Sequence, residues 1–145
     1  RSNIFCLKTL GNKIRVVGPK TLIPRGIESL GVEVAHNMFD GLQDIDVVMV
    51  LRLQKERMDG GFLSSEREYF HHYGLDEKKM QYANPNAIIM HPGPMNRGIE
   101  IDGDLADDIN RSVITKQVEV GLAIRMAVLD LLTRGHPLRK KCQEQ

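Results

Sequence analysis

The fold of this chain is decided by residues 47–57, which read Val-Val-Met-Val-Leu-Arg-Leu-Gln-Lys-Glu-Arg. The first five residues are apolar and three of them are β-branched, which is typical of a strand covered on both faces. The stretch then becomes polar at Arg52 and Gln54. Because these residues are two apart in an extended segment, their side chains should point to the same side. A guanidinium beside a carboxamide suits a carboxylate ligand, and a solvated loop is the equally weighted alternative.

The composition predicts one compact domain with no polyanionic partner. The chain has 145 residues, which is enough for one domain and too few for two ordinary ones. Its 20 basic and 19 acidic residues give a formal net charge of +1, so neither nucleic acid nor an anionic membrane is expected as a partner. No apolar run reaches membrane-spanning length and the N-terminal segment lacks a signal-peptide pattern, so a cytoplasmic location is expected.

Several motif classes are absent from the sequence. Cys6 and Cys142 form neither a disulfide framework nor a zinc motif, and Cys6, among apolar neighbours, is expected to be buried. The five histidines are not spaced as metal ligands. No glycine-rich nucleotide-binding motif follows a strand, and no serine lies in a nucleophile elbow.

Strands and helices are expected to alternate along the chain. The expected strands cover residues 14–17, 32–35, 47–51 and 87–90, and the expected helices cover residues 2–10, 24–30, 65–73, 76–82 and 115–133. Ser65, with Glu68 three residues later, predicts a capping box. This alternation predicts an α/β fold with a doubly wound, Rossmann-like parallel sheet.

The fourth expected strand leads directly into a stiff turn, His-Pro-Gly-Pro-Met-Asn-Arg-Gly, at residues 91–98. Pro92 and Pro94 restrict the backbone and have no N–H group, so the turn offers mainly carbonyl oxygens. Such oxygens can accept from the amide or amine of a ligand. At the carboxyl end of a strand this interpretation is favoured over a turn that binds nothing.

The final helix, over 115–133, carries apolar residues around so much of its circumference that we expect another domain or subunit to cover it. Residues 1–134 are expected to form the domain, and residues 135–145 a charged tail. The glycine-rich segment over 58–63 is expected to be a mobile loop above the end of the sheet.

Three segments together resemble the catalytic chain of the bacterial aspartate carbamoyltransferase family. They are Leu51–Arg57, Met90–Gly98 and Ser112–Val118, and the segments Arg1–Asn3 and Gly18–Pro24 fit as well. The likeness extends over essentially the whole chain, in order, and the set of motifs is highly specific. It implies the second, aspartate-binding half of a two-domain enzyme.

The resemblance implies transfer of the carbamoyl group from carbamoyl phosphate to L-aspartate, the committed step of pyrimidine synthesis, without a metal or organic cofactor. By position, Arg52 would hold an aspartate carboxylate and Gln54 would assist it. Carbonyls of Pro92, Gly93 and Pro94 would accept from the carbamoyl amide and the aspartate amine. Arg97 and Glu100 would support closure of the two domains.

The sequence departs from the family by omission. The first, carbamoyl-phosphate domain, with most phosphate contacts and the threefold interface, has no counterpart here, and neither does the strand that in the family precedes Arg1 inside the sheet. A homotrimer of complete chains is implied, with regulatory chains or a dihydroorotase as further candidate partners. The alternatives are a sister carbamoyltransferase with another amine acceptor, or a non-catalytic fragment that serves in assembly.

Overall fold

The structure of the chain is a computed structural model that describes residues 1–54 and 65–134. The loop expected over 58–63 and the tail expected over 135–145 lie outside these ranges.

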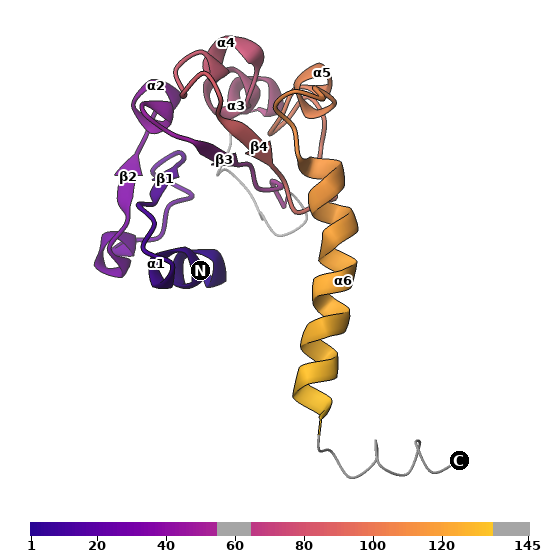
Figure 1. Ribbon diagram of the computed structural model, residues 1–145. Coiled ribbons are helices and arrows are strands. Elements are labelled where there is room, and N and C mark those ends of the chain that lie inside the picture. The colour runs from indigo at the N-terminus through magenta and orange to yellow at the C-terminus, as the bar shows by residue number, and fades with distance from the viewer. Residues whose placement is uncertain (55–64, 135–145) are drawn as a thin grey trace.

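The described residues form short strands joined by helices (Figure 1). In chain order the elements are α1 (Ser2–Thr9), β1 (Arg15–Val17), the 3-10 helix η1 (Ile27–Leu30), β2 (Glu33–Ala35), α2 (Met38–Leu42), β3 (Val47–Met49), α3 (Glu66–Tyr73), α4 (Glu77–Met80), β4 (Ile88–Met90), α5 (Gly103–Ala106) and α6 (Ile114–Thr133). Each strand has three residues, so the strands are shorter than predicted. The α/β class is as predicted.

The strands pair in parallel, as predicted, and they do so in two separate pairs. In one pair Val16 of β1 lies opposite Val34 of β2, and in the other Val48 of β3 lies opposite Ile89 of β4. Within the described ranges, no strand pairing joins one pair to the other. The predicted single sheet is therefore present as two parallel halves, and one edge of β1 and one of β3 are not paired with another described strand.

The two halves are connected by helices and side chains. Gly41 of α2 comes so near the Val17 side chain of β1 that an added Cβ would lie 2.6 Å from a Val17 methyl. Only glycine therefore permits this approach of α2 to β1 without a rearrangement. The Tyr73 hydroxyl of α3 donates to the His36 carbonyl, just after β2, at 2.8 Å.

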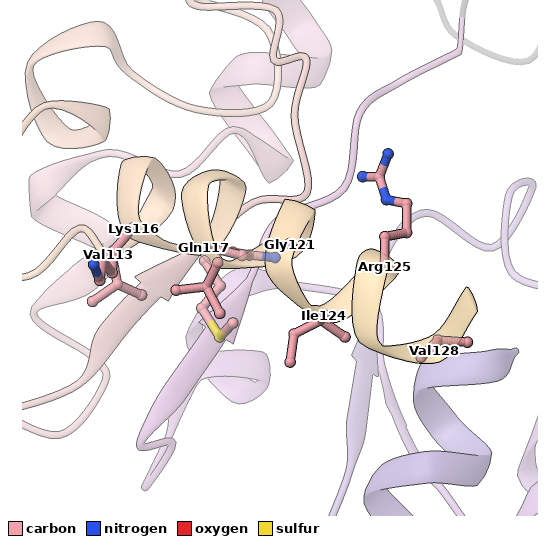
Figure 2. A pocket seen from close by; sticks show the side chains of 9 residues that line it. Val113, Lys116, Gln117, Gly121, Ile124, Arg125 and Val128 are labelled. Carbon is pink, nitrogen blue, oxygen red and sulfur yellow. The ribbon is translucent and has the colours of Figure 1, made fainter. Parts of the chain in front are cut away.

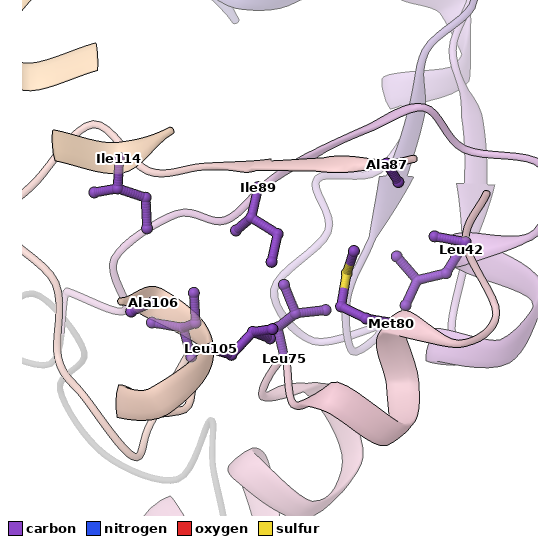
Figure 3. Packing of buried hydrophobic residues seen from close by; sticks show 10 residues of the cluster. Leu42, Leu75, Met80, Ala87, Ile89, Leu105, Ala106 and Ile114 are labelled. Carbon is purple, nitrogen blue, oxygen red and sulfur yellow. The ribbon is translucent and has the colours of Figure 1, made fainter. Parts of the chain in front are cut away.

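The hydrophobic core surrounds β4. Figure 3 shows the buried apolar side chains gathered from β4, from the helices α2, α4, α5 and α6, and from connecting segments. Ile89 and Ile101 are fully buried, and Leu75 and Met80 are nearly so. The backbone of Ile89 also binds the segment just before α6: its N–H donates to the Arg111 carbonyl at 2.8 Å, and its carbonyl accepts from the Val113 N–H at 3.0 Å. Within β4, Ile89 is buried, while Ile88 and Met90, whose side chains point to the other face, are half-buried.

The predicted helix cap at Ser65 is confirmed, and Asp76 provides a second cap. The Ser65 hydroxyl accepts from the Glu68 N–H at 3.1 Å and begins α3. Asp76 accepts in the same way from the Lys79 N–H at 2.8 Å and begins α4. Each cap satisfies one N–H group that would otherwise lack a partner at a helix start.

The prediction that Cys6 is buried is wrong, because this cysteine is exposed. It belongs to α1, in which no residue is buried. Apolar neighbours in the sequence suggested a core helix, but α1 finds too little described surface to pack against.

The long helix α6 projects away from the rest of the described chain (Figure 1). Only Ile114, at its start, is buried, while Leu122 is 64% exposed and Leu132 is 77% exposed. So broad an exposed apolar surface is typical of an interface. Within the described ranges, α6 and the other helices all fall short of the length and apolarity needed to span a membrane.

Replacing Ile89 with Ala should lower the free energy of unfolding by about 2–5 kcal/mol, because the change leaves a cavity in the centre of the core. Denaturant titration monitored by circular dichroism measures this change. The control is Ile109→Ala, since Ile109 is 94% exposed; its effect should stay within about 0.5 kcal/mol. Equal effects of the two changes would contradict the proposed core.

Candidate functional site

A pocket of about 540 Å³ lies beyond the carboxyl ends of β3 and β4. Its lining residues come from three segments: Leu22, then Leu51, Arg52, Leu53 and Gln54, then Pro92, Gly93 and Pro94. This is the position at which parallel α/β sheets bind their ligands. The predicted arginine and carboxamide and the predicted turn therefore face one cavity.

The arm that follows β3 alternates as the sequence predicts. Leu53 is only 7% exposed, whereas Arg52 is half-buried and Gln54 is exposed. The buried Leu53 anchors the arm in the protein, and Arg52 and Gln54 line the pocket beside Leu51 and Leu53. The site thus combines a cation, an amide and a set of carbonyl groups.

The turn after β4 has a defined backbone conformation. Gly93 has a φ of 63°, in the left-handed region that glycine adopts without strain, and the Gly93–Pro94 peptide bond is cis. The Gly93 N–H donates to Nδ1 of His91 at 2.9 Å. The His91 N–H in turn donates to Oε1 of Gln117 in α6 at 3.0 Å.

Beneath the turn lies a buried pair of ionisable side chains. His91 is fully buried and Glu100 is 2% exposed, and Nε2 of His91 lies 3.5 Å from Oε1 of Glu100. The same Glu100 oxygen accepts from the backbone N–H of Asn96. Burial lowers the pKa of His91, and the nearby Glu100 carboxylate opposes this shift only in part.

Asn96 connects the turn to the arm. Its side-chain amide donates to the Leu53 carbonyl at 3.3 Å, between the two predicted ligand residues of the arm. This residue is not predictable from the sequence, because nothing in its spacing indicates a bond to a segment more than forty positions away.

Arg97 and Glu100, which the sequence assigns to one role, lie in different surroundings. Arg97 is half-exposed and forms a bidentate ion pair with Asp107, with N···O distances of 2.6 and 2.8 Å. Hydrogen bonds from the Arg97 guanidinium lower the pKa of Asp107. Glu100 is instead held inside the protein, so a shared part in domain closure stays a prediction.

Leu22 is the other site residue that sequence analysis missed. It follows the Gly18-Pro19 turn after β1, so it belongs to the β1–β2 half, whereas the other lining residues follow β3 and β4. The rule that ligands bind at the carboxyl ends of strands applies to β1 as well and would have indicated this segment.

A second hollow, of about 640 Å³, runs along α6. Figure 2 shows Gln117, Gly121, Ile124 and Val128 following one another along the helix on this surface. Its walls are mainly apolar, and it does not include the arm or the turn. We therefore assign the chemistry to the pocket at the strand ends and regard the α6 groove as a packing surface.

Across residues 1–54 and 65–134, His, Cys, Asp and Glu side chains nowhere gather in threes in a way that could hold a metal ion.

The fold and the pocket together define an α/β substrate-binding domain. Residues 1–132 match the family model described as aspartate/ornithine carbamoyltransferase, Asp/Orn binding domain. The chain therefore belongs to the aspartate/ornithine carbamoyltransferase family.

Curated relatives carry the more specific name. The chain is 67% identical over 135 residues to the aspartate carbamoyltransferase catalytic subunit of Dinoroseobacter shibae, and 66% identical over 135 residues to that of Roseobacter denitrificans. Each match covers 93% of this chain and 43% of the relative. The chain thus spans less than half the length of these relatives.

Solved structures agree on the fold. Ornithine carbamoyltransferase from Pyrococcus furiosus superposes with a TM-score of 0.76 at 24% identity, covering 92% of this chain and 46% of that chain. Aspartate transcarbamoylase from Trypanosoma cruzi in complex with phosphate gives a TM-score of 0.63 at 27% identity, covering 81% and 40%. The prediction of one half of a two-domain carbamoyltransferase is confirmed.

His91 should be neutral at pH 7 and carry its proton on Nε2, because Nδ1 accepts from the Gly93 N–H and burial lowers the pKa. Long-range ¹⁵N–¹H NMR spectra distinguish the two ring tautomers from the charged ring. The exposed His71 and His72 serve as internal controls. As the pH falls, His91 should become charged only below about 6.5, the ordinary histidine pKa. A charged His91 ring at pH 7 would contradict this assignment.

Proposed function

We propose that this chain is the aspartate-binding half of an aspartate carbamoyltransferase, which converts carbamoyl phosphate and L-aspartate to N-carbamoyl-L-aspartate and phosphate for pyrimidine synthesis. The observation that carries the proposal is the pocket in which Arg52 and Gln54 meet the Pro92-Gly93-Pro94 turn. It combines a carboxylate-binding cation with acceptors for N–H groups, and both substrates carry the matching groups.

Each side of the pocket has a distinct role in the proposed reaction. The Arg52 guanidinium binds an aspartate carboxylate through two parallel hydrogen bonds, and Gln54 assists it. Carbonyls of Pro92, Gly93 and Pro94 accept from the carbamoyl amide and from the aspartate amine. The neutral amine nitrogen then bonds to the carbamoyl carbon, the bond from this carbon to the phosphate oxygen breaks, and the departing phosphate takes up the proton that the nitrogen loses.

The chain's contribution to this reaction is positional and electrostatic. No described side chain needs to form a covalent bond with the substrate, because the amine is itself the nucleophile. Holding the amine against the carbamoyl carbon converts an encounter of two molecules into a reaction within one complex. The fixed dipoles of the turn act where the amine develops charge.

A sister carbamoyltransferase with another amine acceptor is the second candidate, since ornithine carbamoyltransferases share this fold. Two observations favour aspartate. The positively charged Arg52 lines the pocket and would repel a cationic side chain such as that of ornithine. The relatives at 67% and 66% identity are named aspartate carbamoyltransferases.

The complete protein would supply what this chain does not show. A carbamoyl-phosphate domain would provide most phosphate contacts, and a strand from the preceding segment would pair between β1 and β3. The carbamoyl-phosphate domain would also cover α6, whose exposed apolar residues include Leu122, Ile124 and Leu132. Complete chains would assemble as homotrimers in the cytoplasm, with regulatory chains or a dihydroorotase as further candidate partners.

The 145 residues alone should have no measurable turnover, because the phosphate-binding domain is not part of the sequence. The measurement is a colorimetric assay for carbamoyl-aspartate at saturating substrates, with the complete protein as the positive control. Formation of carbamoyl-aspartate by the purified chain would refute the proposal that the reaction needs both domains. Inactivity of the complete protein would favour a non-catalytic assembly module.

In the complete protein, Arg52→Lys should raise the KM for aspartate by about tenfold or more, because a point charge cannot replace a bidentate guanidinium and charged hydrogen bonds contribute about 1.5–3 kcal/mol. The KM for carbamoyl phosphate should change by less than about threefold by the same argument. Steady-state kinetics with each substrate varied in turn provides both values.

The matched control is Arg25→Lys, since Arg25 is exposed and does not line the pocket. It should leave both KM values unchanged. Equal losses for the two substrates in Arg52→Lys would count against Arg52 as the aspartate-binding group.

A further inference from the structure

The backbone N–H groups of the turn are held from below by side chains. Pro92 and Pro94 have no N–H group, so residues 92–96 contain three. The Gly93 N–H is bound by Nδ1 of His91 at 2.9 Å, and the Asn96 N–H is bound by Oε1 of Glu100. Two of the three N–H groups are therefore directed into the protein, at the two ends of the turn.

The acceptors themselves are a linked and buried pair. Nε2 of His91 and Oε1 of Glu100 lie 3.5 Å apart, and the two side chains are 0% and 2% exposed. Neither residue lines the pocket, so neither touches a ligand there. Burying a carboxylate is costly unless hydrogen bonds or an opposite charge compensate it. Here the Asn96 N–H and the His91 ring lie against the Glu100 carboxylate.

We propose that His91 and Glu100 are positioning residues, which hold the N–H groups of the turn and thereby direct its carbonyl oxygens toward the bound substrates. This inference rests on the proposed function of the pocket. A peptide group has its N–H and C=O on opposite sides, so fixing the N–H side of Gly93 also fixes the carbonyl of Pro92 in the same peptide plane.

The same network sets the distance between the two sides of the site. Glu100 holds the Asn96 backbone, and the Asn96 side chain donates to the Leu53 carbonyl at 3.3 Å. Leu53 lies between Arg52 and Gln54, so the carboxylate-binding arm is tied to the turn through Asn96. A shift of about 1 Å between these parts would reduce the rate about 100-fold.

Two substitutions of His91 separate the positioning hydrogen bond from the rest of the side chain. In His91→Asn an amide oxygen can occupy the place of Nδ1 and still accept from Gly93. In His91→Gln the amide group lies near the place of Nε2, and the Gly93 N–H loses its acceptor. In the complete protein, kcat should fall about 100-fold in His91→Gln and less than about tenfold in His91→Asn.

Three readouts test whether position, and not folding, is affected. The KM for aspartate should change by less than about threefold in both variants, because Arg52 still binds the carboxylate. Hydrogen exchange of the Gly93 amide should be fast in His91→Gln and slow in His91→Asn. Glu100→Gln, which keeps an acceptor for Asn96, should retain more kcat than Glu100→Met. His72→Gln is the surface control.

The inference is overturned if His91→Asn and His91→Gln have equal kcat values, if only KM changes, or if the loss of kcat follows the melting temperature. The wild-type assay distinguishes failure of the positioning role from failure of the proposed function. If the complete wild-type protein forms no carbamoyl-aspartate, the proposed function fails, while Gly93 exchange still decides whether His91 holds the turn.

Discussion

The structure depends on how the backbone polar groups of one turn are satisfied. Directly after β4 the chain contains two prolines, and the N–H groups at the turn's two ends are bound by a buried histidine and a buried carboxylate. Buried polar groups that are left unpaired cost about 1–3 kcal/mol each, so this arrangement strongly favours a single conformation. Pro92, Gly93 and Pro94 line the pocket, where the arm after β3 adds a guanidinium and a carboxamide.

The parallel strands make this meeting of distant segments possible. β3 and β4 are adjacent and point the same way, so the residues after Met49 and those after Met90 emerge at one edge. The apolar core beneath them, centred on Ile89, gives that edge a rigid support. Polar side chains that follow the strand, such as Arg52 and Gln54, then lie at the pocket. Leu53, between them, is buried and anchors the arm.

Features with a local physical cause were predictable from the sequence. The four strands, the Ser65 cap and the shared orientation of Arg52 and Gln54 follow from periodicity and from caps a few residues apart. Other features depend on contacts between remote segments. The contact from Asn96 to Leu53 has no local pattern, and Leu22, although it follows β1, joins the pocket only because the two strand pairs pack together. Cys6 was misassigned for the same reason, since apolar neighbours do not reveal how much surface a helix finds to cover it.

The position of Leu22 has a consequence for how the pocket responds to distant changes. Leu22 belongs to the β1–β2 half and Arg52 to the β3–β4 half, and no strand pairing joins these halves within residues 1–54 and 65–134. The distance between Leu22 and Arg52 across the pocket therefore depends on how the two halves pack against each other. A substitution at a contact between the halves, such as the hydrogen bond from the Tyr73 hydroxyl to the His36 carbonyl, can therefore alter ligand affinity without touching the ligand.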